Sequence, residues 1–155
     1  MTKKYKLDSI DIKILKVLNS NGKMSNIELS KKVGISPSPC LRRVKILEDN
    51  KIIKGYSVDI DFSFLEYNLV FFASISTNFS NNKEKELLEK ELLSINEVLE
   101  VYILNSDKDY LVKIIVKNYL DYKVVVNTKL TRLPFIKNIR TTKINTTLKK
   151  SGFVL

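Results

Sequence analysis

Apolar residues recur at helical spacing in three successive segments within the first fifty positions, and short polar connections separate the segments. The first segment follows Asp8 or Ser9, either of which can cap a helix, and it ends at the pair Asn21-Gly22. Its apolar positions are Ile10, Ile14, Leu15, Val17 and Leu18. The spacing therefore predicts an amphipathic helix between these two signals.

The second segment carries its own start and stop signals. Ser25 is followed three residues later by Glu28, the capping-box spacing in which each side chain accepts a hydrogen bond from the backbone N–H of the other residue. Gly34 stands at the far end, where a residue that tolerates positive φ commonly terminates a helix. We therefore expect a short helix between Ser25 and Gly34.

Two prolines stand at the front of the third segment, where they favour the start of a helix. Ser36 is a suitable N-cap, and Pro37 occupies the first helical position, where its missing N–H has no partner to lose. Pro39 still lies within the first turn. The apolar stripe behind the prolines consists of Cys40, Val44 and Leu47. The residues that we expect to remain available to solvent are Ser38, Arg42, Arg43 and Lys45.

Two short helices joined by a glycine-centred turn are typical of the helix-turn-helix that enters the major groove, especially when the second helix begins with small polar residues and arginines. The alternative is that exposed Arg and Lys side chains only solvate their helix. The alternation from Ile52 to Asp59 then predicts a short strand, with a wing-like hairpin or a linker beyond it. Lys51 and Lys54 are placed to contact phosphates, which position a duplex without reading its sequence.

The remaining residues alternate between strand and helix patterns. Strands are expected at residues 69–77, 98–104, 110–116 and 136–144, and helices at 82–95, capped by Asn82, and at 119–132, stopped by Pro134. The resulting order, β-α-β-β-α-β, is the ferredoxin-like split unit, with helices on one face of an antiparallel sheet. The sequence thus predicts an α+β protein with a helix-turn-helix domain and strand linker at residues 1–60 and a ferredoxin-like domain at 61–155.

The predicted strands carry apolar residues on both faces, as in the run LVFFA at residues 69–73. Helices cover only one face of such a sheet, so the other face needs a second covering. Self-association, most often through two-fold symmetry, is one solution and also suits the reading of palindromic DNA. The alternative is that these runs are buried within the monomer.

The charge distribution adds a class of partner to this picture. The formal net charge is +10, and residues 1–60 contribute +7 of it, from 13 Lys and Arg against 6 Asp and Glu. An excess of this kind over the helical segments favours a polyanionic partner, double-stranded DNA above all. The alternative is that the many Lys, Asn and Ile residues only reflect the composition of an AT-rich genome.

Composition also excludes several classes of site. The chain has one cysteine, Cys40, and no histidine, so neither an intrachain disulfide nor a Cys/His metal site is credible. No Ser/His/Asp, Cys/His or paired-carboxylate constellation is evident, so we expect no enzyme activity and no cofactor. No apolar run approaches a membrane span, and the N-terminus lacks an apolar signal core, so we expect a cytoplasmic protein without a membrane partner.

Three stretches together resemble the leucine-responsive regulatory protein (Lrp)/AsnC family of transcription regulators. They are LDSIDIKILKVLNSNGKMSNIELSKKVGISPSPCLRRVKILEDNKIIKGY, NSDKDYLVKIIV and LTRLPFIKNIRTT. The family pattern SPxPCxxRVxxLExxGxI appears here as SPSPCLRRVKILEDNKII, which makes the first stretch the most specific. The resemblance covers almost the entire chain.

The resemblance implies a DNA-binding N-terminal domain and an amino-acid-sensing C-terminal domain that forms dimers, which assemble further into tetramers or octamers. The effector would bind between dimers, near a turn usually written Gly-Asp-x-Asp-Tyr. The residues that we expect to contact DNA are Ser25, Asn26, Ser36, Ser38, Pro39, Arg42, Arg43 and Lys45. The residues that we expect around the effector are Asn105, Ser106, Asp107, Asp109, Tyr110 and Thr141.

The sequence departs from the family pattern at three places. Asn50-Lys51 replaces a pair that contains glycine, Ser106 stands at the glycine of the effector turn, and Phe135 follows Leu-Pro where glycine is common. A Cβ at such positions obstructs close backbone approach and disfavours positive φ. Asp107 and Asp109 also have a simpler interpretation, since Asp is an ordinary turn residue.

These patterns predict a sequence-specific transcription regulator whose dimer presents paired third helices to successive major grooves. One alternative is an architectural DNA-binding protein without sequence preference or effector response, which the same charge and oligomerisation would support. An enzyme is a further alternative, because sirohaem decarboxylases resemble these regulators. Those enzymes rely on histidine and arginine near their substrate, and this chain has no histidine.

Overall fold

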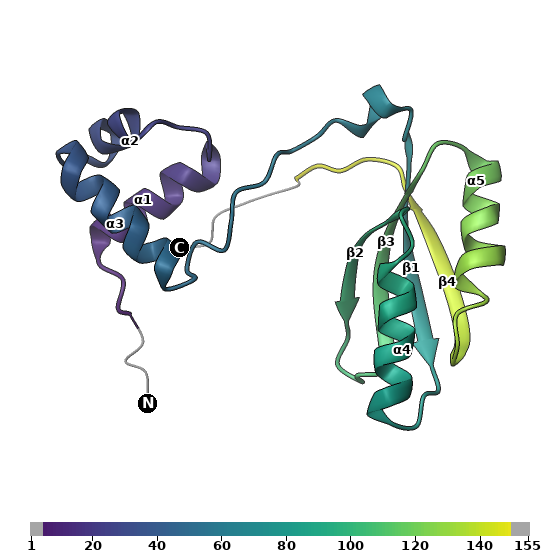
Figure 1. Cartoon of the computed structure of the whole chain (residues 1–155). Helices are drawn as coiled ribbons and strands as arrows, with labels where there is room; N and C mark the ends of the chain where they lie inside the picture. The colour runs from purple at the N-terminus through teal and green to yellow at the C-terminus, as the bar shows by residue number, and fades with distance from the viewer. Residues whose placement is uncertain (1–4, 150–155) are drawn as a thin grey trace. The chain divides into compact units, whose positions relative to one another are not determined.

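The computed structural model describes residues 5–149, and the chain divides into two compact units, one that ends at Asp59 and one that spans Ile60–Leu148 (Figure 1). The outermost parts of both predicted domains, residues 1–4 and 150–155, lie outside the described residues. No helix within residues 5–149 is long and apolar enough to cross a membrane.

The first unit contains three helices, α1 (Ser9–Ser20), α2 (Asn26–Val33) and α3 (Pro37–Asp49). Asp8 caps α1, and its Oδ1 accepts hydrogen bonds from the backbone N–H groups of Ile10 and Asp11. The predicted capping box of Ser25 and Glu28 is present at the start of α2. Gly34 ends α2 with a φ of 83°, which confirms the expected left-handed turn.

The third helix begins where predicted. Ser36 occupies the N-cap position without a side-chain capping bond, and Pro37 is the first helical residue. At the other end, Lys51 has a φ of 57°, its N–H donates to Glu48 O, and Ile52 N–H donates to Leu47 O. This hydrogen-bond pattern is the Schellman motif, whose left-handed position is usually glycine. In this chain a lysine occupies that left-handed position.

The core of this unit lies between the three helices and consists of Ile14, Leu29, Val33, Cys40 and Leu47. Val44 is half-buried beside it, which confirms the predicted stripe on α3. The strand predicted from Ile52 to Asp59 is not formed, so this prediction is wrong for the chain by itself. A strand needs a neighbouring backbone with which to exchange hydrogen bonds, and residues 5–59 contain no other strand.

The second unit is a four-stranded antiparallel sheet with helices on one face, in the predicted β-α-β-β-α-β order (Figure 1). Its strands are β1 (Leu69–Thr77), β2 (Val98–Ile103), β3 (Asp109–Val116) and β4 (Ile136–Ile144), and the strand order across the sheet is β2-β3-β1-β4. A short 3-10 helix, Phe62–Leu65, precedes β1. This arrangement is the expected ferredoxin-like α+β fold.

The helices of this unit are α4 (Asn82–Leu93) and α5 (Tyr119–Val124), and α5 continues as a π-helical segment at Val125–Leu130. Asn81, rather than the predicted Asn82, caps α4, because its backbone is extended and its Oδ1 accepts from Glu84 N–H. The core contains Leu88 and Leu92 of α4, Val125 and Leu130 of the second helix, and Phe71, Ala73 and Ile75 of β1. Because these β1 residues share one face, both helices cover the same side of the sheet.

The other face of the sheet is more open. Val70 and Phe72 of β1 are half-buried there, Ser74 is exposed, and Lys113 of β3 lies opposite Phe72 and pairs with Glu100 of β2. This face is therefore apolar along β1 and charged towards β2. As predicted, β1 carries apolar residues on both faces of the sheet. The helices cover only one of these faces.

Candidate DNA-binding and effector sites

The N-terminal end of α3 is an exposed surface made of small polar residues, prolines and basic residues. Among the side chains predicted to contact DNA, Ser36, Ser38, Pro39, Arg42 and Lys45 are all exposed. Cys40, which lies between them in sequence, is buried in the core, and burial raises the pKa of its thiol. The cysteine thus anchors the helix, and the adjoining exposed side chains are free to meet a ligand.

Ser25 and Asn26, also predicted to contact DNA, are engaged within the protein. Ser25 Oγ donates to Glu28 Oε2 at 2.7 Å, and this contact holds the pKa of Glu28 below its usual range. Asn26 Nδ2 donates to the backbone carbonyl of Pro37 at 2.8 Å, so it ties the start of α2 to the start of α3. Asn26 Oδ1 is buried without a hydrogen-bond partner among the residues that the structure describes.

Arg43 departs from the expectation that it faces solvent. Its side chain is 26% exposed, and Nη1 lies 2.8 Å from Asp8 Oδ2 and 2.7 Å from Asp11 Oδ1. Hydrogen bonds to Asp11 and then to Asp8 raise the pKa of Arg43 above its ordinary value. The prediction that Arg43 is available to solvent is therefore wrong, because helical periodicity does not reveal the acidic residues at the start of α1.

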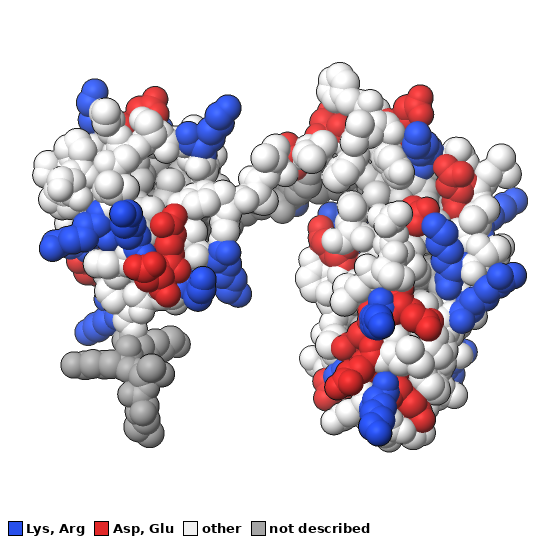
Figure 2. Space-filling model, in the orientation of Figure 1, with Lys and Arg blue, Asp and Glu red and all other residues white. Residues whose placement is uncertain are grey.

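Figure 2 shows how charge is distributed over the visible faces of the two units. On the first unit, basic side chains lie at several places with acidic ones between them. Over α4 of the second unit, Lys and Glu side chains alternate closely, as expected from the sequence NKEKELLEKELL. The sequence count, rather than this one view, assigns most of the basic excess to residues 1–60, with a net charge of +7.

The predicted effector turn joins β2 to β3. Ser106 Oγ donates to Asp109 Oδ2 at 2.7 Å, and this hydrogen bond is the main reason that the pKa of Asp109 lies below its usual value. Ser106, at the family's glycine position, does not have a positive φ, whereas Asp107 has a φ of 54°. Asp tolerates this conformation better than most residues, so the turn accommodates a serine without backbone strain at that position.

Tyr110 is buried inside the second unit, whereas Thr141 is half-buried. Tyr110 is 0% exposed, and its hydroxyl donates to Glu89 Oε1 of α4 at 3.0 Å. Burial and this hydrogen bond raise the pKa of Tyr110. Thr141 Oγ1 lies 2.6 Å from the hydroxyl of Tyr122 on α5. Within one chain, β1 separates β4 from β3, so Thr141 is not brought together with residues 105–110, which run from the turn into β3.

Phe135, the other departure from a family glycine, has a φ of 62°. Its carbonyl accepts a 2.9 Å hydrogen bond from Asn78 N–H, and its ring packs against the core of the sheet unit. The positive φ is uncommon for an aromatic residue. The backbone here, as at Lys51, retains the conformation that glycine favours.

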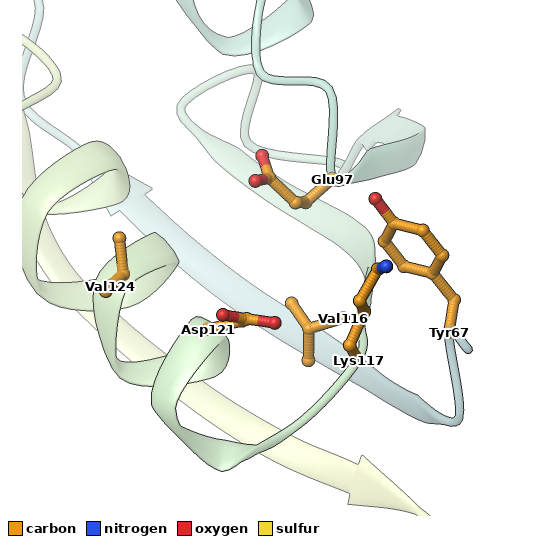
Figure 3. Close-up of a pocket in the computed structure, with 6 residues that line it drawn as sticks. All are labelled: Tyr67, Glu97, Val116, Lys117, Asp121 and Val124. Carbon is orange, nitrogen blue, oxygen red and sulfur yellow. The ribbon is translucent and has the colours of Figure 1, made fainter. Parts of the chain in front are cut away.

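A pocket of about 220 Å³ lies at the opposite end of β3 from the effector turn (Figure 3). Its lining residues are Tyr67, Glu97, Val116, Lys117, Asp121 and Val124. The figure shows Tyr67 beside Lys117 on one side and Val124 on the other. Lys117 pairs with Glu66 at 3.0 Å, and Glu97 pairs with Lys129 at 2.6 Å. Sequence reasoning missed this pocket because its walls come from separate segments whose adjacency no local pattern encodes.

The described residues contain no group of three or more His, Cys, Asp or Glu side chains that could hold a metal ion.

Comparison with known proteins identifies both units. Residues 7–54 match a family described as winged helix-turn-helix DNA-binding, and residues 70–153 match the Lrp/AsnC ligand binding domain. The chain is 38% identical to the leucine-responsive regulatory protein of Haemophilus influenzae over 96% of its own length and 90% of the relative. It is 35% identical to the protein of the same name from Escherichia coli, with 94% and 89% covered.

Solved structures agree with this assignment. A transcriptional regulator from Neisseria meningitidis, in complex with L-Met, superimposes with a TM-score of 0.88 at 30% identity and covers 94% of each chain. The E. coli AsnC structure has the same fold, with a TM-score of 0.83, 23% identity, and 96% of this chain and 99% of that one covered. Matches to both domain families, together with relatives that cover nearly all of the chain, show that this protein belongs to the Lrp/AsnC family of DNA-binding transcription regulators.

Proposed function

We propose that this regulator reads specific operator sequences by inserting the N-terminal end of α3 into the major groove. The single observation that carries this proposal is the exposed surface formed by Ser36, Ser38, Pro39, Arg42 and Lys45 on a helix whose opposite side is buried. Small side chains at the start of the helix allow close approach to the groove, and the basic side chains behind them match phosphates and base edges. A cytoplasmic location accompanies this role, since the partner is cellular DNA.

The proposed binding unit is a dimer, which assembles further into tetramers or octamers. The open sheet face around Val70 and Phe72 supports self-association, because half-buried apolar residues on a sheet gain stability when a second surface covers them. A two-fold axis would then place two copies of α3 in a fixed geometry that matches paired half-sites.

We further propose that an amino acid binds between dimers and shifts the assembly. The Neisseria meningitidis relative was solved with L-Met, and the curated relatives are named for their response to leucine. In this chain the proposed effector residues are those of the turn, Asn105, Ser106, Asp107 and Asp109, with Tyr110 and Thr141 in support. Because Thr141 is remote from the turn within one chain, a site that uses both needs two chains. An effector acts through such a site when its affinity differs between two states of assembly.

A binding titration tests the DNA proposal. Fluorescence anisotropy at one fixed salt concentration compares a duplex from the promoter upstream of this protein's own gene with a random duplex of the same length. A sequence-specific regulator should bind its operator about a thousandfold or more tightly than the random duplex. Equal affinity for a panel of duplexes covering the neighbouring promoters would contradict specific reading and support the architectural alternative.

Thermal unfolding with each of the twenty amino acids tests the effector proposal, since a ligand that binds the native assembly raises its midpoint. The matched variants are Asp107→Asn and Glu86→Gln. Asn keeps the size of Asp and tolerates positive φ, so Asp107→Asn should fold normally and lose the midpoint shift. Glu86 is an exposed carboxylate on α4, and its substitution should leave the shift intact. An unchanged shift in Asp107→Asn, or no shift with any amino acid, would contradict the proposal.

A further inference from the structure

Arg43 connects α3 to the beginning of α1 through two carboxylates. Its Nη1 donates to Asp8 Oδ2 at 2.8 Å and to Asp11 Oδ1 at 2.7 Å. Asp11 is 1% exposed, whereas Asp8 remains half-exposed. The guanidinium thus neutralises a buried negative charge that would otherwise be costly to keep away from water.

The two carboxylates are themselves held in place. Asp11 Oδ2 accepts hydrogen bonds from the Tyr5 hydroxyl at 3.0 Å and from Asp8 N–H at 3.1 Å. Asp8 Oδ1 accepts from the N–H groups of Ile10 and Asp11, each at 2.9 Å. Each acid therefore has one oxygen committed to the N-terminal end of α1 and the other directed to Arg43. We call Asp8, Asp11 and Arg43 the α1–α3 ion triad.

Among the described residues, the triad is the second of two polar side-chain attachments between α3 and the other helices of the unit. The first is the hydrogen bond from Asn26 Nδ2 to Pro37 O at the start of the helix. Arg43 lies six residues further on, which is about 9 Å along a helix axis. Attachments to two different helices at two heights fix both the rotation of α3 about its axis and its inclination. Those two quantities decide which side chains reach a groove.

Arg42 provides a direct contrast to its neighbour. Its side chain is exposed and forms no salt bridge among the residues that the structure describes. Adjacent helical residues point about 100° apart, so Arg42 and Arg43 face different surroundings. Two neighbouring arginines that look equivalent in the sequence thus have different environments.

We infer that Arg43 is a positioning residue of the DNA-reading helix, which acts through Asp8 and Asp11, and that it does not itself contact DNA. The contacts are left to Arg42, Lys45 and the small residues at the start of α3. This inference rests on the proposed sequence-specific binding. The inference predicts that removal of a negative charge from Asp8 or Asp11 weakens specific DNA binding. Simple electrostatics predicts the opposite change in affinity, because DNA is itself negatively charged.

The test measures affinity for an operator duplex and for a random duplex at several salt concentrations. The variants are Arg43→Gln, Asp11→Asn, Asp8→Asn and the double variant Asp11→Asn/Arg43→Gln, and Arg42→Gln is the matched control. Asn is as good an N-cap as Asp, so Asp8→Asn removes the charge while it preserves the start of α1. Circular dichroism and the unfolding midpoint establish that each variant is folded at the temperature of the titration.

The triad variants should lose about tenfold or more in operator affinity, comparable to one mismatched base pair. Their affinity for the random duplex and their salt slope should stay close to wild type, because no phosphate contact is removed. The double variant should lose no more than Arg43→Gln, since both changes break one interaction. Arg42→Gln should weaken binding to both duplexes and reduce the magnitude of the salt slope by about one.

Two outcomes would overturn the inference. One is a reduced salt slope in Arg43→Gln like that of Arg42→Gln, which would make Arg43 a phosphate contact. The other is wild-type or tighter operator binding by a folded Asp8→Asn or Asp11→Asn variant. If Asp11→Asn does not fold, Asp8→Asn at the half-exposed position decides the question. Failure of the proposed sequence-specific function would look different, because the wild-type protein would then bind the operator and the random duplex equally. The salt slopes measured on random DNA would still show whether Arg43 contacts phosphates.

Discussion

The hydroxyl of Tyr56 donates a hydrogen bond to Glu48 Oε1 across 2.8 Å, which joins the segment that follows α3 to the helix itself. The ring also lies close to Gly22, where a Cβ would come within 3.3 Å of Tyr56 Cδ1. The start of the segment after the helix-turn-helix is therefore packed on the first unit, although it forms no strand there.

This contact predicts a loss of stability at alkaline pH. Burial, followed by the hydrogen bond to Glu48, raises the pKa of Tyr56 to about 12. The pKa of Tyr56 in the folded protein lies above its unfolded value of about 10. The contribution of this tyrosine to the free energy of unfolding is therefore fully present below pH 10 and is lost as pH rises towards 12. Tyr56→Phe should cost about 0.5 kcal/mol at pH 8 and remove this part of the alkaline loss. Urea unfolding of the wild type and of Tyr56→Phe from pH 8 to 12 measures both the loss at pH 8 and the alkaline loss. If the unfolding free energies of the two proteins fall in parallel as pH rises, Tyr56 is not the source of the alkaline loss.

Lys51→Gly should stabilise the protein. Lys51 holds the left-handed position of the Schellman motif after α3, with a φ of 57°, which disfavours residues that carry a Cβ. Glycine should relieve about 1 kcal/mol of backbone strain. Lys51→Ala is the control, since alanine removes the same charge but keeps a Cβ. Equal midpoints for the glycine and alanine variants in thermal unfolding would show that the conformation costs nothing.

Gly34→Ala should destabilise the helix-turn-helix by about 1 kcal/mol. The position has a φ of 83°, and a Cβ there would meet nothing within 4 Å, so the whole effect comes from backbone conformation. Gly55→Ala is the matched control, because its Cβ would also meet nothing within 4 Å and its φ is not positive. Gly55→Ala should be neutral or slightly stabilising. Denaturant unfolding compares the pair, and equal losses would refute the conformational explanation.

Thr141→Val should destabilise the sheet unit by about 1 kcal/mol, because the Tyr122 hydroxyl loses the partner that lies 2.6 Å away. The ring of Tyr122 stacks on Phe71 at a centroid distance of 4.1 Å, so it cannot turn towards solvent without a loss of packing. Thr141→Ser keeps the hydroxyl and should retain most of the stability. Similar unfolding free energies for the valine variant and the wild type would show that the hydrogen bond is dispensable.

For the effector residues, the family pattern predicted the position in the fold but not the contacts of the side chains. The pattern correctly indicated a turn between β2 and β3, but the predicted turn residues Asp109 and Tyr110 already belong to β3. It could not indicate that Tyr110 is buried against α4, because Glu89 lies 21 residues earlier in the chain. Whether Tyr110 and Thr141 support an effector stays a prediction.

The sequence by itself determined the elements of this protein, because their signals act over a few residues. Asp8 and the box of Ser25 and Glu28 set helix starts through hydrogen bonds to nearby backbone groups. The prolines favour the start of α3 through their fixed φ, and Gly34 ends α2 through its positive φ. Alternation within single segments likewise placed the four strands of the sheet, with shifts of one residue at the ends of β2 and β3.

Only the tertiary structure decided which side chains are free. Arg43 looked exposed from the periodicity of α3, but its partners Asp8 and Asp11 lie 35 and 32 residues away in the chain. The segment from Ile52 to Asp59 alternates like a strand, and yet no backbone within residues 5–59 is positioned to pair with it. Both outcomes depend on contacts between segments distant in sequence, and such contacts exist only once the helices have packed.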